Sequence, residues 1–354
     1  MNSNNHLVIM AGGIGSRFWP MSTRQRPKQF IDVLGCGRTL IQLTADRFSG
    51  ICPPQNTWVV TSRAYADIVR QQLPQIPESN ILCEPERRNT APCIAYVSWK
   101  IKAANPKANI VVTPSDHIVM DVREFQRVIA SALAFTADSD AILTLGMKPS
   151  RPETGYGYIE ADLSTPAVAN KEVFRVDSFK EKPDIETAEQ YIRHKNYFWN
   201  AGIFVWNVET IVNAFRIWQP EIAAIFEKMM PDFYTDREQE LIDSQFPSCP
   251  NISVDYAILE KADEIFVFPA DFGWSDLGTW GSLYAQLDKD LNGNVAIGKD
   301  VTLYESHDCI VHATQEKKVV VIGVDNVIIA EDDDQLLVCK KADEQRIKEF
   351  SDKQ

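Results

Sequence analysis

The residues with the clearest chemical signal lie near the N-terminus, where glycines and basic residues follow a short apolar run. Residues 11–30 read AGGIGSRFWPMSTRQRPKQF. From Gly15 to Arg38 the chain carries one acid, Asp32, and five basic residues: Arg17, Arg24, Arg26, Lys28 and Arg38. Glycines allow backbone N–H groups to approach a phosphate closely, and cations neutralise its charge. We therefore predict a phosphate-binding loop, the alternative being a solvated basic turn.

This loop differs from the two common nucleotide-binding motifs. The chain has no G-x-x-x-x-G-K-[ST] pattern, which excludes a P-loop. Gly13 and Gly15 lack the third glycine of the dinucleotide fingerprint, because Phe18 stands at its position. A nicotinamide dehydrogenase is therefore disfavoured.

Two aspartates, Asp116 and Asp276, follow apolar runs and precede turn residues. Carboxylates at strand ends suit Mg²⁺, which prefers oxygen ligands and keeps several waters. Taken singly, each aspartate could instead cap a helix. With a polyphosphate site in the same chain, we expect a magnesium site.

A second group of polar residues stands at the end of one expected strand and the start of another. Lys182 could pair with a phosphate, and Glu181 and Asn200 suit the hydroxyl groups of a sugar. Each of these signals is weak by itself. His117 could act as a base, but a histidine beside a capping aspartate is more often structural, so we assign no histidine a role.

The elements that must position these residues alternate between strand and helix. Short apolar strands are expected at 6–10, 57–61, 80–83, 110–113 and 141–145, with helical patterns at 39–51, 64–73, from 89 onward and at 124–136. This alternation of strands and helices predicts an α/β fold with a Rossmann-like, mixed and mostly parallel sheet flanked by helices. Ligands of such sheets lie beyond the carboxyl ends of the strands.

Near Asn292 the sequence pattern changes to short apolar segments, typical of strands, that are separated by Gly, Asp and Asn. We expect a large domain over residues 1–291 and a small β-rich domain, compatible with coils of a β-helix, over 292–354 with a terminal helix.

Charge and cysteine content limit the partners. The chain has 354 residues and a net charge of -13, which disfavours nucleic acid and anionic membranes as partners. It has no apolar run of the ~20 residues that a membrane span requires. Its seven cysteines include no C-x-x-C pair, which argues against a disulfide scaffold or a thiolate zinc site and predicts reduced thiols in the cytoplasm.

The motifs together resemble the mannose-1-phosphate guanylyltransferases, a family of sugar nucleotidyltransferases. Residues 12–30 match the family signature except for Phe18, Met21 and Thr23, which replace Leu, Leu and Arg. Ser115 and Ala201 are departures from the more frequent P-A-D-H and W-N-S-G. The remaining motifs occur in family order at 84–85, 88–92, 114–117, 179–183, 199–204, 253–257 and 274–278.

The resemblance implies a role for each matching residue. Arg17 and Lys28 would hold the GTP phosphates, Asp116 and Asp276 the Mg²⁺, and Lys182 the phosphate of the sugar. Mannose would lie against Gly157, Glu181 and Asn200. The nucleotide would also contact Ala11, Gly12, Gly13, Gly15, Ser16, Glu84, Asn89 and Thr90.

Glu84 stands where thymidylyl- and uridylyltransferase relatives tend to place a glutamine near the base. A carboxylate there could accept hydrogen bonds from both N1–H and the amine of guanine. Asn89 and Thr90 are rivals for this role.

The implied reaction transfers GMP from GTP to α-D-mannose 1-phosphate and gives GDP-mannose and pyrophosphate, with Mg²⁺ assisting in-line attack. A relative that uses glucose 1-phosphate, dTTP or UTP is the first alternative. A non-catalytic sugar-nucleotide sensor is disfavoured, because Lys28, Asp116 and Asp276 are all present. In the family that the chain resembles, similar β-rich C-terminal segments support subunit contacts. The resemblance therefore implies a homodimer through residues 292–354. We expect that this segment is not needed for the chemistry.

Overall fold

The computed structural model describes residues 2–13, 15–313, 317–332 and 334–351. Its contacts divide the chain into two compact units. The first unit consists of Met1–Gly12, Ala45–Pro114 and Met120–Trp274, and the second of Gly13–Thr44, Ser115–Val119 and Ser275–Gln354. Packing therefore groups the N-terminal segment Gly13–Thr44 with the C-terminal part of the chain.

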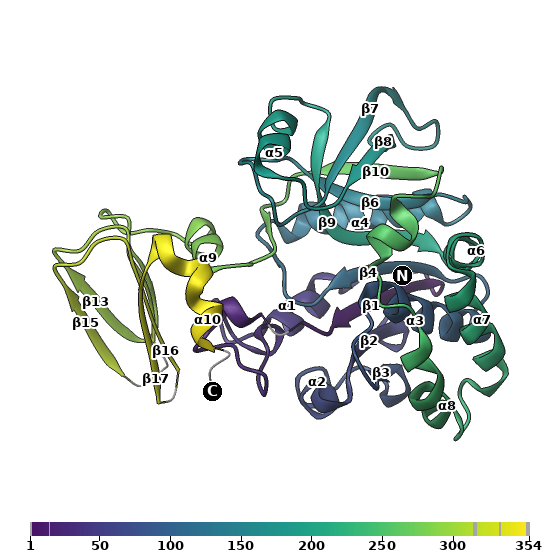
Figure 1. Ribbon diagram of the computed structural model, residues 1–354, viewed down its shortest axis with the longest axis horizontal. Helices are drawn as coiled ribbons and strands as arrows, with labels where there is room; N and C mark the ends of the chain where they lie inside the picture. Colours follow the sequence, from purple (N-terminus) through teal and green to yellow (C-terminus); the bar gives the residue numbers. More distant parts are fainter. Residues whose placement is uncertain (1, 14, 314–316, 333, 352–354) are drawn as a thin grey trace. The chain divides into compact units, whose positions relative to one another are not determined.

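The first unit is built on a nine-stranded mixed sheet with the order β3-β2-β1-β4-β9-β6-β10-β8-β7 (Figure 1). The pairs among β3, β2, β1 and β4 and the pair β6–β10 are parallel, whereas β9, β7 and β8 run antiparallel to their neighbours. The strands are β1 (Asn5–Ala11), β2 (Thr57–Ser62), β3 (Ile81–Glu84), β4 (Asn109–Pro114), β6 (Ile142–Met147), β7 (Tyr158–Pro166), β8 (Phe174–Lys180), β9 (Tyr197–Asn207) and β10 (Ile265–Ala270). The predicted Rossmann-like α/β class is confirmed.

Helices bury the central strands. In β1 and β4, consecutive residues such as Leu7, Val8 and Ile9 are fully buried, as expected where both faces of a sheet are covered. Helix α3 packs against α6 and α7, and α4 packs on β4, β6, β9 and β10. The helices of this unit are α2 (Ala66–Gln72), α3 (Thr90–Ala104), α4 (Val122–Thr136), α5 (Ile185–Tyr191), α6 (Val208–Trp218), α7 (Pro220–Met229) and α8 (Glu238–Gln245), and α1 (Leu40–Arg47) joins the two units in sequence.

The second unit ends in the predicted β-rich domain. Strands β12, β14 and β16 pair in parallel, as do β13 and β15, which is the pattern of successive β-helix coils; β16 and β17 close the sheet as a hairpin. The elements are α9 (Trp280–Gln286), β12 (Val295–Ile297), β13 (Asp300–Tyr304), β14 (Ile310–His312), β15 (Lys318–Ile322), β16 (Val327–Asp332), β17 (Gln335–Lys340), the 3-10 helix η9 (Lys341–Arg346) and α10 (Ile347–Ser351). Two further short strands are β5 (Ile118–Val119) and β11 (Trp274–Ser275).

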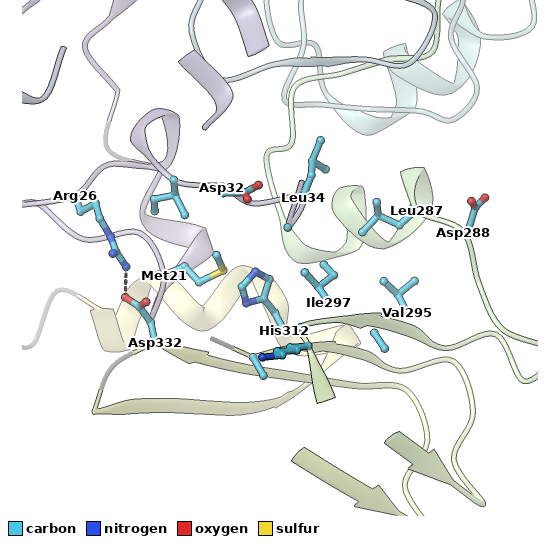
Figure 2. A pocket seen from close by; sticks show the side chains of 16 residues that line it. Met21, Arg26, Asp32, Leu34, Leu287, Asp288, Val295, Ile297, His312 and Asp332 are labelled. Atoms are coloured by element: carbon cyan, nitrogen blue, oxygen red, sulfur yellow. Dashed lines mark hydrogen bonds and ion pairs between the residues drawn. The ribbon is translucent and has the colours of Figure 1, made fainter. Parts of the chain in front are cut away.

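We call Gly13–Thr44 the signature segment. It holds two single-turn 3-10 helices, η1 (Ser16–Phe18) and η2 (Lys28–Phe30), and its apolar side chains share one buried cluster with the C-terminal elements. Phe18 and Met21 lie in this cluster with Trp280. Figure 2 shows another pocket of the second unit, about 800 Å³ in volume, which is lined by Met21 and by His312 of β14 and in which Arg26 is ion-paired to Asp332 of β16. The C-terminal strands therefore support the predicted phosphate loop.

No helix among the described residues is long and apolar enough to cross a bilayer.

Candidate active site

A pocket of about 380 Å³ in the second unit brings together residues from distant parts of the sequence. Four of the five predicted catalytic residues line it, and they come from the signature segment and from the turns after β4 and β11. The lining residues are Gly15, Arg17, Lys28, Asp116, His117, Asp276, Leu277, Gly278 and Lys348.

Lys28 is the centre of this pocket. Its side chain is almost fully buried, and its Nζ lies 3.0 Å from Asp116 Oδ2. The same ammonium donates to the main-chain oxygens of Asp276 and Leu277, each at 2.9 Å. An ammonium has three N–H donors, so these three acceptors use its full capacity. Lys28 therefore joins Asp116 to the turn that carries Asp276.

The backbone around Lys28 is specialised to allow these contacts. Gly15 has a φ of +69°, and a Cβ there would lie 2.6 Å from Lys28 Cβ, so only glycine fits this position without displacement. Leu277 is fully buried with a φ of +47°, an unfavourable conformation for a non-glycine residue. Such strain persists where surrounding contacts hold it, and it clusters at functional sites.

The electrostatics keep Asp116 charged. Burial raises the pKa of its carboxyl group, but the charges of Lys28 and His117 and the hydrogen bond from Lys28 outweigh burial, and the pKa falls below its ordinary value. His117 Nε2 lies 3.8 Å from Asp116 Oδ1. The carboxylate of Asp276 accepts from the main-chain N–H of Gly278 at 3.0 Å. The pocket thus presents two carboxylates within a largely cationic setting.

These two carboxylates fit a hard divalent cation. Among the described residues, no group of three or more His, Cys, Asp or Glu side chains could hold a metal. An ion bound by Asp116 and Asp276 would therefore take its remaining ligands from water and substrate oxygens. Mg²⁺ is usually bound in this way, through one or two carboxylates and phosphate oxygens.

The predicted sugar-binding residues lie in the first unit, where they form a second cluster. A Cβ on Gly157 would lie 2.5 Å from Glu181 Oε2, so glycine makes room for this carboxylate. Asn200 donates to Asp255 Oδ1 at 2.9 Å and accepts from Thr144 Oγ1 at 3.0 Å. The cluster presents carboxylate and amide groups, which suit the hydroxyls of a sugar.

Lys182 adds a cation to this sugar cluster. Its Nζ donates to Glu181 Oε1 at 2.6 Å, and its φ is +46°. Burial lowers the pKa of the amine, but Glu181 and Asp255 outweigh this and raise it above its ordinary value. The pKa of Asp255 is raised to about 6 by burial and by the charge of Glu181.

The predicted base-binding residues lie at the end of β3 and the start of α3. Glu84 is 8% exposed, its Oε1 has no hydrogen-bond partner among the described residues, and burial raises its pKa to about 8 despite a hydrogen bond from Cys93 and the charge of Arg87. Asn89 has a φ of +66° and caps α3. The hydroxyl of Thr90 accepts from the N–H of Val254 at 2.8 Å, so it anchors the chain next to Asp255.

The glycine-rich stretch leaves backbone open where the phosphates were predicted. A Cβ built on Gly12 or Gly13 would meet nothing within 4 Å, whereas Ala11 is buried and its carbonyl accepts from Thr61 Oγ1 at 2.8 Å. Ser16 begins η1, and its side chain is outside the described part of the structure.

Comparisons with known proteins identify the family of the chain. Residues 6–293 match the model of the nucleotidyl transferase family, and residues 298–353 match that of the mannose phosphate isomerase/GMP-like β-helix domain. A mannose-1-phosphate guanylyltransferase of Escherichia coli is 34% identical over 96% of this chain and 74% of its own length. Mannose-1-phosphate guanylyltransferase 2 of Escherichia coli O157:H7 is 36% identical over 97% of this chain and 72% of its own length.

A solved structure covers nearly the whole chain as well. The crystal structure of a mannose-1-phosphate geranyltransferase from Thermus thermophilus superposes with a TM-score of 0.88 at 29% identity, covering 99% of this chain and 98% of that one. This chain belongs to the mannose-1-phosphate guanylyltransferase family. Like other members of the nucleotidyl transferase family, it is an enzyme.

Three further residues of this guanylyltransferase-family chain lie at these sites, although the sequence analysis assigned them no function. Asp255 lies in the matched motif at 253–257, so the resemblance could have found it. Gln29 also lies in a matched motif, and its Nε2 donates to the carbonyl of Gly13 at 2.9 Å. Lys348 lies in the C-terminal helix, where no motif marks it.

We expect Gly15→Ala to lower turnover about tenfold or more with the fold retained, because the new methyl group would displace Lys28 from its three acceptors. Gly37→Ala is the matched control: Gly37 has a φ of +81° in the same segment, but a Cβ there meets nothing within 4 Å. Steady-state kinetics and thermal melting of both variants measure the effect. Equal activity of the two variants would show that the contact with Lys28 is unimportant.

We expect Glu84→Gln to stabilise the free protein, and more at pH 8 than at pH 5. The folded-state pKa of about 8 lies above the ordinary 4.5. The wild type therefore loses stability as pH rises between these values, whereas the amide does not titrate. The gain should be about 2–4 kcal/mol larger at pH 8, measured by urea unfolding. Glu240→Gln, at an exposed carboxylate, is the control. A gain independent of pH would contradict the raised pKa.

Proposed function

We propose that the protein transfers GMP from GTP to α-D-mannose 1-phosphate and releases pyrophosphate. The observation that carries this proposal is the pocket in which buried Lys28 holds Asp116 next to the turn of Asp276, in a chain of this family. Two polyanions must meet for this reaction, and the pocket supplies cations together with two carboxylates that can recruit a further cation. GDP-mannose is the product.

Mg²⁺ bound by Asp116 and Asp276 would neutralise phosphate charge and polarise the α-phosphate. Phosphate oxygens and water would supply the other ligands, so the two aspartates would suffice as protein ligands. Lys28 favours the ionised form of Asp116 by lowering its pKa, and Arg17 in the same pocket can bind phosphate oxygens.

The attacking group needs no general base. A phosphate monoester has a second pKa near 6, so near pH 7 the sugar phosphate is largely a dianion. One of its oxygens forms a bond to the α-phosphorus of GTP, and the bond from that phosphorus to the bridging oxygen breaks in line with it. The electron pair of that bond leaves with pyrophosphate. The protein's part is positioning and charge stabilisation, for which Lys182 would hold the phosphate of the sugar.

Glu84 supports a preference for guanine in this proposal. Its buried Oε1 has no partner among the described residues, and N1–H and the exocyclic amine of guanine are donors that a carboxyl group can satisfy. Asn89 and Thr90 remain rivals for this role, since each side chain accepts one main-chain N–H and keeps further hydrogen-bonding capacity.

We expect the wild type to release pyrophosphate fastest from GTP with mannose 1-phosphate, in a panel that also includes dTTP, UTP and glucose 1-phosphate. A clear preference for another nucleotide or for glucose 1-phosphate would contradict the proposal and indicate a related sugar-1-phosphate nucleotidyltransferase.

Asp276→Asn should lower turnover by about a hundredfold or more in Mg²⁺, because it removes a metal ligand but retains the carbonyl that binds Lys28. Asp288→Asn, at an exposed aspartate outside the pocket of Lys28, is the control. Activity of Asp276→Asn equal to that of the control, at several Mg²⁺ concentrations, would refute the metal assignment.

We also propose a homodimer through the C-terminal domain, working in the cytoplasm. Its sheet of β13 and β15 exposes Tyr304, Val320 and Ile322, and β17 of its other sheet exposes Leu336 and Val338, each between 48% and 64% exposed. A second copy covering the sheet of β13 and β15 would bury the exposed apolar side chains of Tyr304, Val320 and Ile322. The seven cysteines are free thiols, which fits a reducing compartment.

We expect Ile322→Asp to convert the dimer into a monomer, measured by size-exclusion chromatography with light scattering. Leu291→Asp places the same charge on an exposed leucine outside these strands and should leave the dimer intact. A dimer that survives Ile322→Asp would show that this face is not the interface.

A further inference from the structure

The C-terminal helix α10 brings a lysine into the pocket of the aspartates. Helix α10 packs on η1 of the signature segment, which carries Arg17. Lys348, the second residue of α10, lines the same pocket as Lys28, Asp116 and Asp276. All of these residues belong to the second unit. Helix α10 thus contributes a residue to the predicted phosphate site.

Two contacts hold α10 at this position. Ile347, next to Lys348, is 2% exposed and packs in the cluster of Phe18 and Trp280. Just before α10, the carboxylate of Glu344 accepts from the main-chain N–H of Gly281 at 2.6 Å, in the first turn of α9. A carboxylate at a helix N-terminus is stabilised by the unpaired N–H groups there. The lysine therefore stands on an anchored element, although its own side chain is exposed.

The charges of the pocket show what Lys348 can do. The ammonium of Lys28 is fully used by Asp116 and two carbonyl groups. In contrast, neither Arg17 nor Lys348 has an ion pair within the described residues. An incoming polyphosphate would thus find two cations with donors available. Charge-assisted hydrogen bonds to phosphate are among the stronger polar contacts in proteins.

We propose that Lys348 is a phosphate-binding catalytic residue, which holds the β- and γ-phosphates of the nucleotide and then the leaving pyrophosphate. The proposal rests on the proposed function for its substrate. When the bond between the α-phosphorus and the bridging oxygen breaks, the electron pair goes to pyrophosphate, and Lys348 stabilises the added negative charge. The C-terminal domain then has a part in the chemistry itself, contrary to the expectation that this segment is not needed for it.

The test compares Lys348→Met with Lys348→Arg and with Lys340→Met. The first removes the charge, the second keeps it, and the third removes a charge from an exposed lysine of β17 outside the pocket. Pyrophosphate and tripolyphosphate binding is measured by calorimetry in the presence of Mg²⁺. The KM values for GTP, for pyrophosphate in the reverse reaction and for mannose 1-phosphate are measured in parallel, with melting temperature as the check on folding.

We expect Lys348→Met to weaken pyrophosphate binding and to raise the KM for pyrophosphate by about tenfold to a hundredfold, the loss of one charged hydrogen bond. The KM for mannose 1-phosphate should stay within about twofold, and Lys348→Arg should restore most of the loss. Constants for Lys348→Met equal to those of Lys340→Met would overturn the proposal. A wild type that binds pyrophosphate but makes no GDP-mannose would refute the proposed function and leave the binding assay as the test of Lys348.

Discussion

The structure of the site depends on one buried positive charge, the ammonium of Lys28. A buried, unpaired ammonium is costly, so this group must find acceptors. It finds them in the carboxylate of Asp116 and in two carbonyls of a turn more than two hundred residues away. The glycine at position 15, the unfavourable φ of Leu277 and the ionised state of Asp116 all serve this arrangement. Without these contacts, Asp116 and the turn that carries Asp276 would no longer be held together.

The chain as a whole is acidic, with a net charge of -13, yet its proposed substrates are polyanions. The negative charge of the whole chain does not prevent anion binding at one place, because basic side chains from the signature segment and from α10 line one small pocket. Lys28 organises the carboxylates, whereas Arg17 and Lys348 keep donors for phosphate. The β-rich domain packs on the signature segment and anchors α10, so the fold of the C-terminal part and the chemistry of the N-terminal loop are linked.

Sequence patterns predicted the alternation of strands and helices because buried strands such as β1 and β4 are apolar throughout. They also predicted Arg17, Lys28, Asp116 and Asp276, since residue type and motif identify groups that can bind phosphate or metal. They did not predict the carbonyl partners of Lys28 or the packing of Gly13–Thr44 with the C-terminal strands, because these contacts join residues far apart in sequence. They did not identify Lys348 either, because a lysine in a short helix has no distinguishing pattern and its pocket is formed by residues far away in sequence.

The most direct test of this account is a crystal structure of the full chain with Mg²⁺ and a GTP analogue whose α–β bridge cannot be cleaved. We expect the triphosphate in the pocket of Lys28, with its β- and γ-phosphates against Arg17 and Lys348. The metal ion should lie about 2.1 Å from carboxylate oxygens of Asp116 and Asp276. A triphosphate bound outside this pocket, or a metal held without either aspartate, would contradict the central claim.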